Sequence, residues 1–251
     1  MSFIEVLRSK TTDNSGNRQP VIAFLGDSVT QGCFEVYWKD NKMQTVFDSL
    51  AGYPEKVKEI LSLLYPKAPV SIVNAGIEGG SAPKGFDRLE RDVLRFKPDL
   101  LVVCFGLNDS NNGVEGIPKY KYALKQIFAK AKEEGIETIF MTPNMLNTDC
   151  STVSDGVVLK NLAEIFAERQ NSGQFDAYMA AAKEACVEEN VGLCDCYEHW
   201  KSMHACGVDT TRLLANGLNH PVREMHYLFA WQLVNTILKE GKEKNYEESK
   251  G

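Results

Sequence analysis

The sequence predicts an α/β fold in which helices cover both faces of a parallel sheet. Five apolar runs of strand length are continuous rather than alternating, which is typical of strands buried on both faces. Stretches with helical periodicity and charged faces separate these runs, so strands and helices alternate and the crossovers are expected to be right-handed. The expected strands are residues 20–26, 70–76, 99–106, 138–143 and 191–196.

The order of elements indicates one domain with three layers, α/β/α. No Gly/Ser-rich or Pro-rich linker and no internal repeat divides the chain, so we expect a single domain over residues 1–251. Its core is expected from about 20 to 240, with flexible termini and a disordered last segment, KEGKEKNYEESKG. Helices are expected near 52–65, 84–96, 118–134, 174–189 and 222–240, with an extra helix within 144–173.

Composition and charge exclude several classes of protein. The 251 residues are 43% hydrophobic and 25% charged, as in an ordinary globular protein that needs no disulfides to hold its core. The net charge is −6 and the basic residues are scattered, so nucleic-acid binding is not expected. Charges interrupt the apolar runs near the N-terminus, so neither a signal peptide nor a membrane span is expected, and a cytoplasmic location follows. The seven cysteines are interpreted as reduced thiols, mostly buried.

Polar residues and glycines follow the expected strands at the edge where open α/β sheets bind ligands. Asp27 and Ser28 follow the first strand, Gly76 ends the second, Asn108 follows the third and Asn144 the fourth. Because parallel strands end at the same edge, these residues are expected to lie close together.

These residue types fit acyl transfer, which needs a nucleophile, a base and donors for an oxyanion. Ser28 is the candidate nucleophile, although a serine after a strand is more often a turn or a helix cap. Gly76 could offer a backbone N–H or could be a plain turn glycine. Asn108 could donate its amide or could close an Asx-turn. Asp27 is expected to support the loop by accepting backbone N–H bonds, since neighbouring side chains point to opposite faces.

The candidate base is His220. It directly precedes Pro221 in a loop before the last helix, from which it can reach the strand ends. His226 falls inside that helix, where packing is the expected role.

A second cluster offers metal ligands as an alternative. The segment CDCYEHWKSMHAC contains Cys194, Cys196, His199, His204 and Cys206. Its spacing does not match a C-x2-C knuckle, and the first two cysteines lie on a buried strand. Core thiols and surface histidines are therefore the favoured interpretation, and no metal site is expected.

Taken together, the segments resemble the SGNH hydrolases, the GDSL esterase/lipase family. RLERDVLRFKPDLLVVCFGLND, residues 88–109, is also similar to the approach to that family's third block. The resemblance spans about residues 20–240. Its blocks appear in order as GDSVTQG with Ser28, NAGIEGGSA with Gly76, GLND with Asn108 and NHP with His220.

The resemblance implies a flavodoxin-like five-stranded sheet of order 2-1-3-4-5. It also implies Ser28 as nucleophile and His220 as general base, with the Ser28 and Gly76 N–H groups and the Asn108 side chain as the oxyanion hole. Family members cleave carboxylic esters of small acyl groups, sugars or lipids, or thioesters, without a cofactor.

One position departs from the family's pattern. An aspartate usually stands three residues before the histidine and holds the imidazole in its tautomer, whereas this chain has Gly217 there. Either a backbone carbonyl orients His220, leaving a Ser–His dyad, or another residue does so, the candidates being Asp209, Glu224 and Asn216. We favour the dyad with a carbonyl.

The substrate is expected to be a small acyl ester. The insertion between residues 32 and 52 carries Phe34, Tyr37 and Trp38, which could line the site with Asn144, or could cover the core or a subunit contact. Deacetylation of a carbohydrate is the leading hypothesis. A lipid-directed esterase, lysophospholipase-like enzyme or thioesterase of the same family and a non-catalytic binding module are the alternatives. No membrane partner is expected, and a homo-oligomer stays open.

Overall fold

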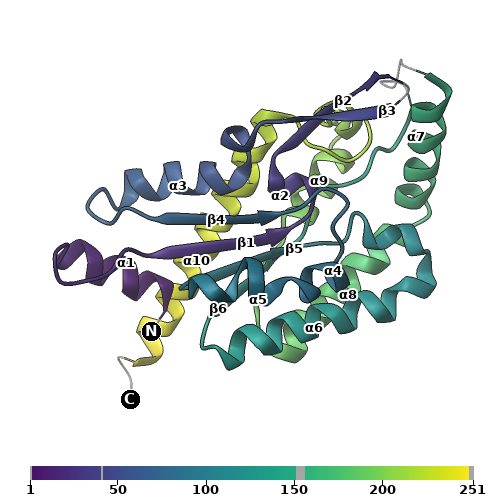
Figure 1. Cartoon of the computed structure of the whole chain (residues 1–251). Coiled ribbons are helices and arrows are strands. Elements are labelled where there is room, and N and C mark those ends of the chain that lie inside the picture. Colours follow the sequence, from purple (N-terminus) through teal and green to yellow (C-terminus); the bar gives the residue numbers. More distant parts are fainter. Residues whose placement is uncertain (1, 41, 151–155, 249–251) are drawn as a thin grey trace.

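Five parallel strands form one sheet at the centre of the computed structural model, which describes residues 2–40, 42–150 and 156–248 (Figure 1). The order β4-β1-β5-β6-β7 is the expected 2-1-3-4-5 order, so the predicted fold class is confirmed. All five predicted strands are present: β1 (Val21–Gly26), β4 (Ser71–Gly76), β5 (Leu100–Cys104), β6 (Glu137–Met141) and β7 (Gly192–Cys194).

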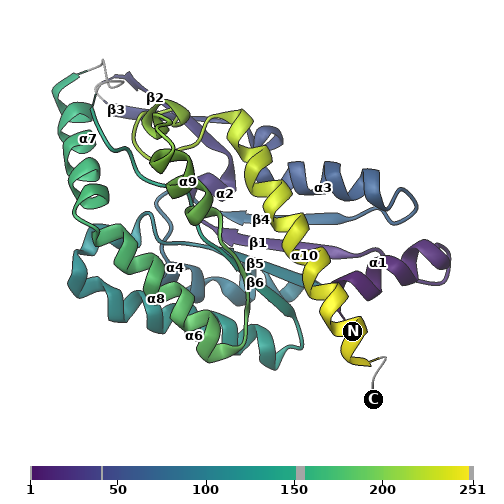
Figure 2. The same ribbon diagram turned by 180° about the vertical axis from the view of Figure 1, so that it is seen from behind.

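Helices cover both faces of this sheet (Figures 1 and 2). On one face α3 (Tyr53–Leu64) packs against α10 (His226–Glu248), which also contacts α1 (Phe3–Thr12) and β7. On the other face α6 (Ile117–Glu133) packs between α4 (Ala82–Asp87) and α8 (Gln174–Glu189). The buried faces of these helices and the apolar strand residues form one continuous hydrophobic core. The extra helix expected within 144–173 is α7 (Gly156–Asn171).

The helix expected over 84–96 is instead three short pieces, α4, α5 (Leu89–Asp92) and the 3-10 turn η2 (Leu94–Phe96). The first break falls at Arg88, whose backbone has φ −110° and ψ 3°. Its guanidinium turns inward and donates to the carbonyls of Gly26, at 2.9 Å, and Ala75, at 2.6 Å. The periodicity of charges and apolar residues could not show that a basic side chain here binds the sheet.

The termini differ from the expected flexible ends. At the N-terminus α1 begins at a capping box between Ser2 and Glu5 and buries Phe3, Ile4 and Leu7 in the core. At the other end α10 continues to Glu248, through most of the segment that was expected to be disordered, and residues 249–251 lie outside the described residues.

Several elements were not predicted. β2 (Cys33–Lys39) and β3 (Lys42–Phe47) form an antiparallel hairpin apart from the main sheet, and α9 (Cys196–Ala205) follows β7. The remaining short elements are α2 (Ser28–Gln31) and the 3-10 turns η1 (Ser49–Ala51), η3 (Asp109–Asn112), η4 (Val114–Gly116), η5 (Thr210–Leu213) and η6 (Arg223–Met225).

In the part of the chain that the structure describes, no helix is both long and apolar enough to cross a membrane.

Candidate active site

Ser28 lies at the carboxyl edge of the sheet, where β1 turns into α2. It is the first residue of this four-residue helix and is almost fully buried. The turn requires glycine at position 26, because a Cβ there would overlap the Thr30 hydroxyl and lie 2.9 Å from the carbonyl oxygen of Cys104. In the register of the parallel sheet, Gly26 pairs with Gly76 of β4 and with Cys104 of β5. Ser28 is therefore held where three strands end.

Asp27 supports the turn. Its Oδ1 accepts a hydrogen bond from Val29 N at 3.0 Å and caps α2, in keeping with the loop-supporting role expected from the sequence. Its Oδ2 is buried and has no hydrogen-bond partner among the described residues. Burial raises the pKa of Asp27 to about 7, because the charged form loses its hydration there.

His220 meets Ser28 directly. Its Nε2 lies 2.9 Å from Ser28 Oγ, and its Nδ1 lies 2.9 Å from the backbone carbonyl oxygen of Phe34. A carbonyl can only accept, so the proton of the neutral imidazole belongs on Nδ1. The lone pair on Nε2 then faces the serine hydroxyl, which is the arrangement a general base requires.

The charge state of His220 follows from its burial. Burial lowers the pKa of His220, while the hydrogen bond to the Phe34 carbonyl and the negative charge of Glu78 act in the opposite direction. The imidazole is consequently neutral at neutral pH and can accept a proton.

The carboxylates considered as orienting groups do not reach the imidazole. Asp209 caps η5 and pairs with Arg212 at 3.1 Å. Glu224 is exposed in η6. Because the Phe34 carbonyl occupies Nδ1, His220 is oriented by a backbone acceptor, the alternative that the sequence favoured.

Asn216 holds the loop of His220 rather than its ring. Its Oδ1 accepts from the backbone N–H groups of Leu218, Asn219 and His220 at 2.9–3.0 Å. Gly217, which stands where the family usually has an acid, has φ +67°. This left-handed conformation favours glycine over residues with a side chain. The turn geometry thus gives Gly217 a conformational role at this position.

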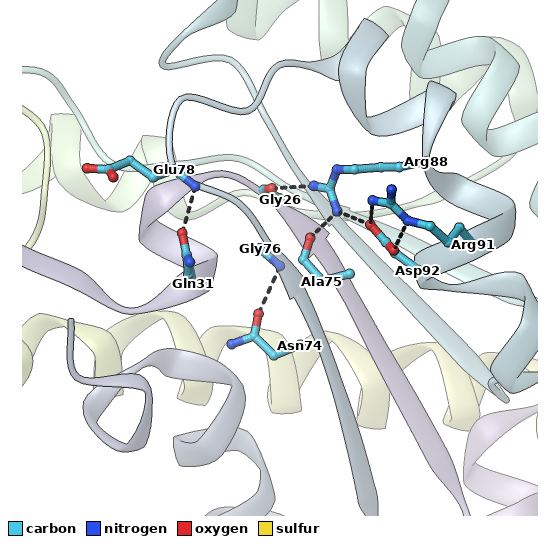
Figure 3. A network of polar contacts seen from close by, with 9 residues as sticks. All are labelled: Gly26, Gln31, Asn74, Ala75, Gly76, Glu78, Arg88, Arg91 and Asp92. Carbon is cyan, nitrogen blue, oxygen red and sulfur yellow. Dashed lines mark hydrogen bonds and ion pairs between the residues drawn. The ribbon is translucent and has the colours of Figure 1, made fainter.

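The glycine expected in the oxyanion hole is engaged elsewhere. The N–H of Gly76 donates to Asn74 Oδ1 at 2.9 Å (Figure 3). A Cβ at Gly76 would overlap the backbone of Gln31, so this glycine allows α2 to pack against β4. Gly79, farther along the loop, has φ +69° and an N–H without a hydrogen-bond partner in the described part of the chain. The sequence pointed to the strand end, whereas the Gly79 N–H, which has no partner among the described residues, lies in the loop.

Asn108 keeps one amide hydrogen available. Its Nδ2 donates to the Gly80 carbonyl at 2.9 Å, which fixes the orientation of the amide. An amide nitrogen carries two hydrogens, so the second remains for another acceptor. The loop that Asn108 binds lies against the turn that carries Ser28, since a Cβ at Gly80 would be 3.5 Å from Asp27 Cα.

Two further contacts fix the loop after β4. Arg88 binds the carbonyls at the ends of β1 and β4 and pairs with Asp92 (Figure 3); the Arg88–Asp92 distance is 3.2 Å. Gln31 Oε1 accepts from the backbone N–H of Glu78 at 2.6 Å, which ties α2 to the loop (Figure 3). The sequence gives no signal of the Arg88 contacts, because an arginine amid other charges in a helical stretch does not reveal a buried role.

The residues expected to line the substrate are arranged differently. Asn144 is buried and donates to the carbonyls of Met145 and Asn219, so it supports the histidine loop. The Phe34 ring is also buried, and only its carbonyl reaches His220. Tyr37 and Trp38 lie on β2 and are 48% and 41% exposed. The Asn144 amide is occupied by its two carbonyl partners and the Phe34 ring by Arg223 and His226, so neither side chain is placed to line the substrate.

A cavity of about 730 Å³ lies beside Asn108. Carboxylate, amide and amine groups share its walls about equally with apolar surface. The lining includes Gly79, Ser81, Lys84, Asp87, Asn108, Asn111, Asn112, Glu115 and Lys119.

The histidines and cysteines considered for metal binding are dispersed. Cys194 and Cys196 are buried with their sulfur atoms 3.7 Å apart, whereas Cys206 is exposed. Within residues 2–40, 42–150 and 156–248, no group of three or more potential ligands is placed to hold a metal ion. His226 is buried against Tyr53 and Phe229 and accepts from Tyr53 N at 3.0 Å, in the packing role expected for it.

Comparison with known proteins adds three similarities. Residues 24–228 match the sequence model of the GDSL-like Lipase/Acylhydrolase family. Among curated proteins, the acetylxylan esterase of Geobacillus stearothermophilus is 33% identical over 89 residues, 35% of this chain and 39% of that protein. The uncharacterized lipoprotein YqeF of Bacillus subtilis is 30% identical over 135 residues, 49% of this chain and 55% of that protein. The chain therefore aligns with about half or less of each relative's length.

Solved structures share the fold. A mutant of Axe2, an acetyl-xylooligosaccharide esterase from Geobacillus stearothermophilus, superimposes with a TM-score of 0.64 at 22% identity. The match covers 87% of this chain and 94% of the other.

Proposed function

Because the chain belongs to the GDSL-like Lipase/Acylhydrolase family, we propose that this serine ester hydrolase removes short acyl groups, acetyl foremost, from carbohydrates. The observation that carries the proposed chemistry is the continuous contact from Ser28 Oγ to His220 Nε2 and from His220 Nδ1 to the Phe34 carbonyl, each 2.9 Å long. It joins a nucleophile, a base and the group that fixes the base's tautomer.

Acylation begins when Ser28 Oγ attacks the ester carbonyl and His220 Nε2 takes its proton. The oxyanion that forms receives hydrogen bonds from the Ser28 N–H and from the second amide hydrogen of Asn108. Gly79, in the loop after β4, is the proposed third donor, because the N–H of Gly76 at the end of the strand is bound to Asn74. The imidazolium then protonates the departing alcohol, leaving an acyl-enzyme.

Deacylation repeats these steps with water. His220 takes a proton from the water as its oxygen attacks the acyl carbonyl. The second tetrahedral intermediate collapses, the imidazolium returns the proton to Ser28 Oγ, and the carboxylic acid leaves. The chain's own residues supply every proton-transfer group in this cycle.

A polar substrate suits the surroundings of Asn108. The adjoining cavity is lined by groups that can exchange hydrogen bonds with hydroxyls, and acyl chains would leave many of these groups unpaired. The similarity to the acetylxylan esterase supports the same choice. These observations favour a sugar ester over the lipid ester of the alternative hypothesis.

The serine mechanism is tested by hydrolysis of p-nitrophenyl acetate. We expect Ser28→Ala and His220→Ala each to lower kcat by at least about 10³-fold, while Ser62→Ala, at an exposed helix position, retains wild-type activity. Substantial activity in Ser28→Ala would contradict the mechanism. If neither wild type nor variant cleaves esters of any chain length, the binding-module alternative replaces it.

The substrate class is tested separately by measuring acetate released from acetylated xylooligosaccharides. We expect a higher kcat/KM on these than on p-nitrophenyl octanoate or a lysophospholipid. A preference for long acyl chains would favour the lipid-directed alternative.

A further inference from the structure

Arg223 fastens the strand that carries the carbonyl acceptor of His220. Its guanidinium donates to both carboxylate oxygens of Glu35, at 2.6 and 3.1 Å, and its Nε donates to Asp48 at 3.2 Å. The guanidinium carbon lies 4.3 Å from the centroid of the Phe34 ring. One side chain therefore contacts the residue whose carbonyl binds the imidazole, its neighbour in sequence, and the segment after the hairpin.

The positions of these residues in the chain give the contacts a specific consequence. Phe34 and Glu35 are adjacent near the start of β2, and Asp48 directly follows β3. Because Cys33 pairs with Phe47, Arg223 bridges the two strands where the hairpin begins and ends in the chain. Arg223 itself stands three residues after His220, at the start of η6. The same residue thus joins the histidine's loop to the strand that supplies the acceptor.

We infer that Arg223 is a positioning residue, which holds the Phe34 carbonyl on Nδ1 of His220. It thereby secures the orientation of the imidazole that a carboxylate would otherwise provide. This inference rests on the proposed Ser28–His220 mechanism.

The chemistry of the contacts favours a geometric role. Isolated ion pairs at a partly exposed position contribute little to stability. A bidentate guanidinium–carboxylate pair stacked on an aromatic ring, however, restricts both the distance and the angle between the two charged groups. The Phe34 ring is also restrained by His226, which packs against it with ring centroids 5.0 Å apart. Two side chains thus hold the residue whose carbonyl binds His220.

A neutral carbonyl makes this placement more important. A carboxylate attracts an imidazolium through its charge over several ångströms, whereas a carbonyl acts mainly through a well-aligned hydrogen bond. If the hairpin shifts, Nδ1 loses its acceptor and the imidazole can adopt the other tautomer, in which Nε2 carries the proton and cannot accept one from Ser28. The other titratable or charged groups that act on this imidazole are Glu78, in the loop after β4, and His226 on α10.

The first test is kinetic. We expect Arg223→Gln to lower kcat for p-nitrophenyl acetate by about 10–100-fold with KM changed less than about threefold, and Arg223→Lys to fall between this variant and wild type. The matched control is Arg212→Gln, which removes an exposed arginine that pairs with Asp209 on η5 and is expected to retain wild-type kcat. Glu35→Gln should reduce kcat in the same direction, and combining it with Arg223→Gln should cost less than the product of the two effects.

The second test reads the imidazole itself and needs no turnover. In histidine-labelled protein, the His220 Nδ1–H resonance, assigned with His220→Gln, should be present in wild type and in Arg212→Gln. In Arg223→Gln it should weaken or move upfield, and the imidazole should titrate at lower pH because the acceptor that favours the imidazolium is lost. An unchanged resonance and titration, with kcat falling only in proportion to the folded fraction, would overturn the inference. Inactive wild-type enzyme would instead contradict the proposed function, and the resonance would still decide the role of Arg223.

Discussion

At the scale of single residues, burial sets the proton occupancy of the site. Burial lowers the pKa of His220, because its imidazolium would lose hydration, so the ring is neutral at neutral pH. Burial raises the pKa of Asp27, because its carboxylate would lose hydration. Both side chains lie at the turn that carries Ser28. In the proposed mechanism His220 moves the reacting proton, whereas Asp27 caps the turn. Their pH dependences can therefore be measured separately.

The pH profile of activity reports on His220. We expect kcat/KM for a short ester to fall on the acid side with an apparent pKa below 6.5, the ordinary value for histidine, because protonation of Nε2 removes the base. Initial rates from pH 4.5 to 8, corrected for the blank, provide the measurement. An acid limb centred at or above pH 7 would contradict a base whose charge is disfavoured by burial.

The pH profile of stability reports on Asp27. Its pKa is about 7 in the folded protein against an ordinary value of 3.8, so the folded state binds the proton more tightly and stability is lost as the pH rises from about 4 to 7. Asp27→Asn retains an oxygen to cap α2 and removes this loss. We expect the variant to be more stable than wild type by about 1–4 kcal/mol at pH 8 and nearly equal to it at pH 4.

Urea denaturation at the two pH values measures the difference. Asp87→Asn, at an exposed position, serves as the control and should leave the pH dependence unchanged. An Asp27→Asn variant that loses stability at pH 8 would show that the ionised carboxylate supports the turn.

At the scale of elements, the histidine loop is a rigid turn and not a flexible connection. A bridge between Leu214 and Pro221 closes it, and the Ala215 N–H donates to the His220 carbonyl at 2.6 Å. Asn144 and Asn147 anchor it from the end of β6, through the carbonyl of Asn219 and the backbone of Leu218. These hydrogen bonds hold the turn in the shape that places His220 against Ser28.

Asn216 is the centre of this turn, and its replacement tests the turn's importance. Asn216→Ala leaves three backbone N–H groups without their acceptor. We expect it to lose about 1–3 kcal/mol of stability and at least about tenfold in kcat, because His220 is displaced. Thermal unfolding and esterase assays measure both effects.

Asn216→Asp is the matched control, since it keeps the accepting oxygen, while it replaces the amide that donates to Asn219 by a second, negatively charged oxygen. It should stay within about threefold of wild-type kcat. Equal activity in the Ala and Asp variants would show that the side-chain acceptor does not position the histidine.

At the scale of the whole molecule, α1 and α10 close the core on one face. Phe3, Ile4 and Leu7 belong to the same buried cluster as the strands and α10. α1 thus contributes to the core that positions the strand ends, although the sequence was expected to be flexible there.

Truncation of one buried side chain on α1 tests this packing. Leu7→Ala should cost about 2–5 kcal/mol, because the core cannot fully close over the space left by Leu7. Its melting temperature should fall by several degrees. Leu63→Ala, at a position 80% exposed on α3, makes the same chemical change and should alter stability by less than about 0.5 kcal/mol. Equal, small effects would mean that α1 is not part of the cooperative core.

Much of this architecture was predictable because it depends on local pattern. Continuous apolar runs marked all five strands, and the polar ends of the first and third strands marked Ser28 and Asn108. The functional residues that the sequence did not reveal act through backbone atoms or through buried contacts. The Phe34 carbonyl has no residue-type signature, and the role of Arg88 at the sheet edge requires knowing where its helical stretch breaks.

The sequence by itself determined the five strands of the central sheet, most of the helices between them and the candidate serine, asparagine and histidine, because hydrophobic periodicity and residue chemistry are local properties. Only the tertiary structure decided which group orients His220 and which loop N–H has no partner among the described residues. Those outcomes depend on where a distant hairpin and a left-handed turn bring backbone atoms together. In place of an aspartate at position 217, the chain has a glycine that shapes the turn, and the carbonyl that meets the imidazole comes from residue 34.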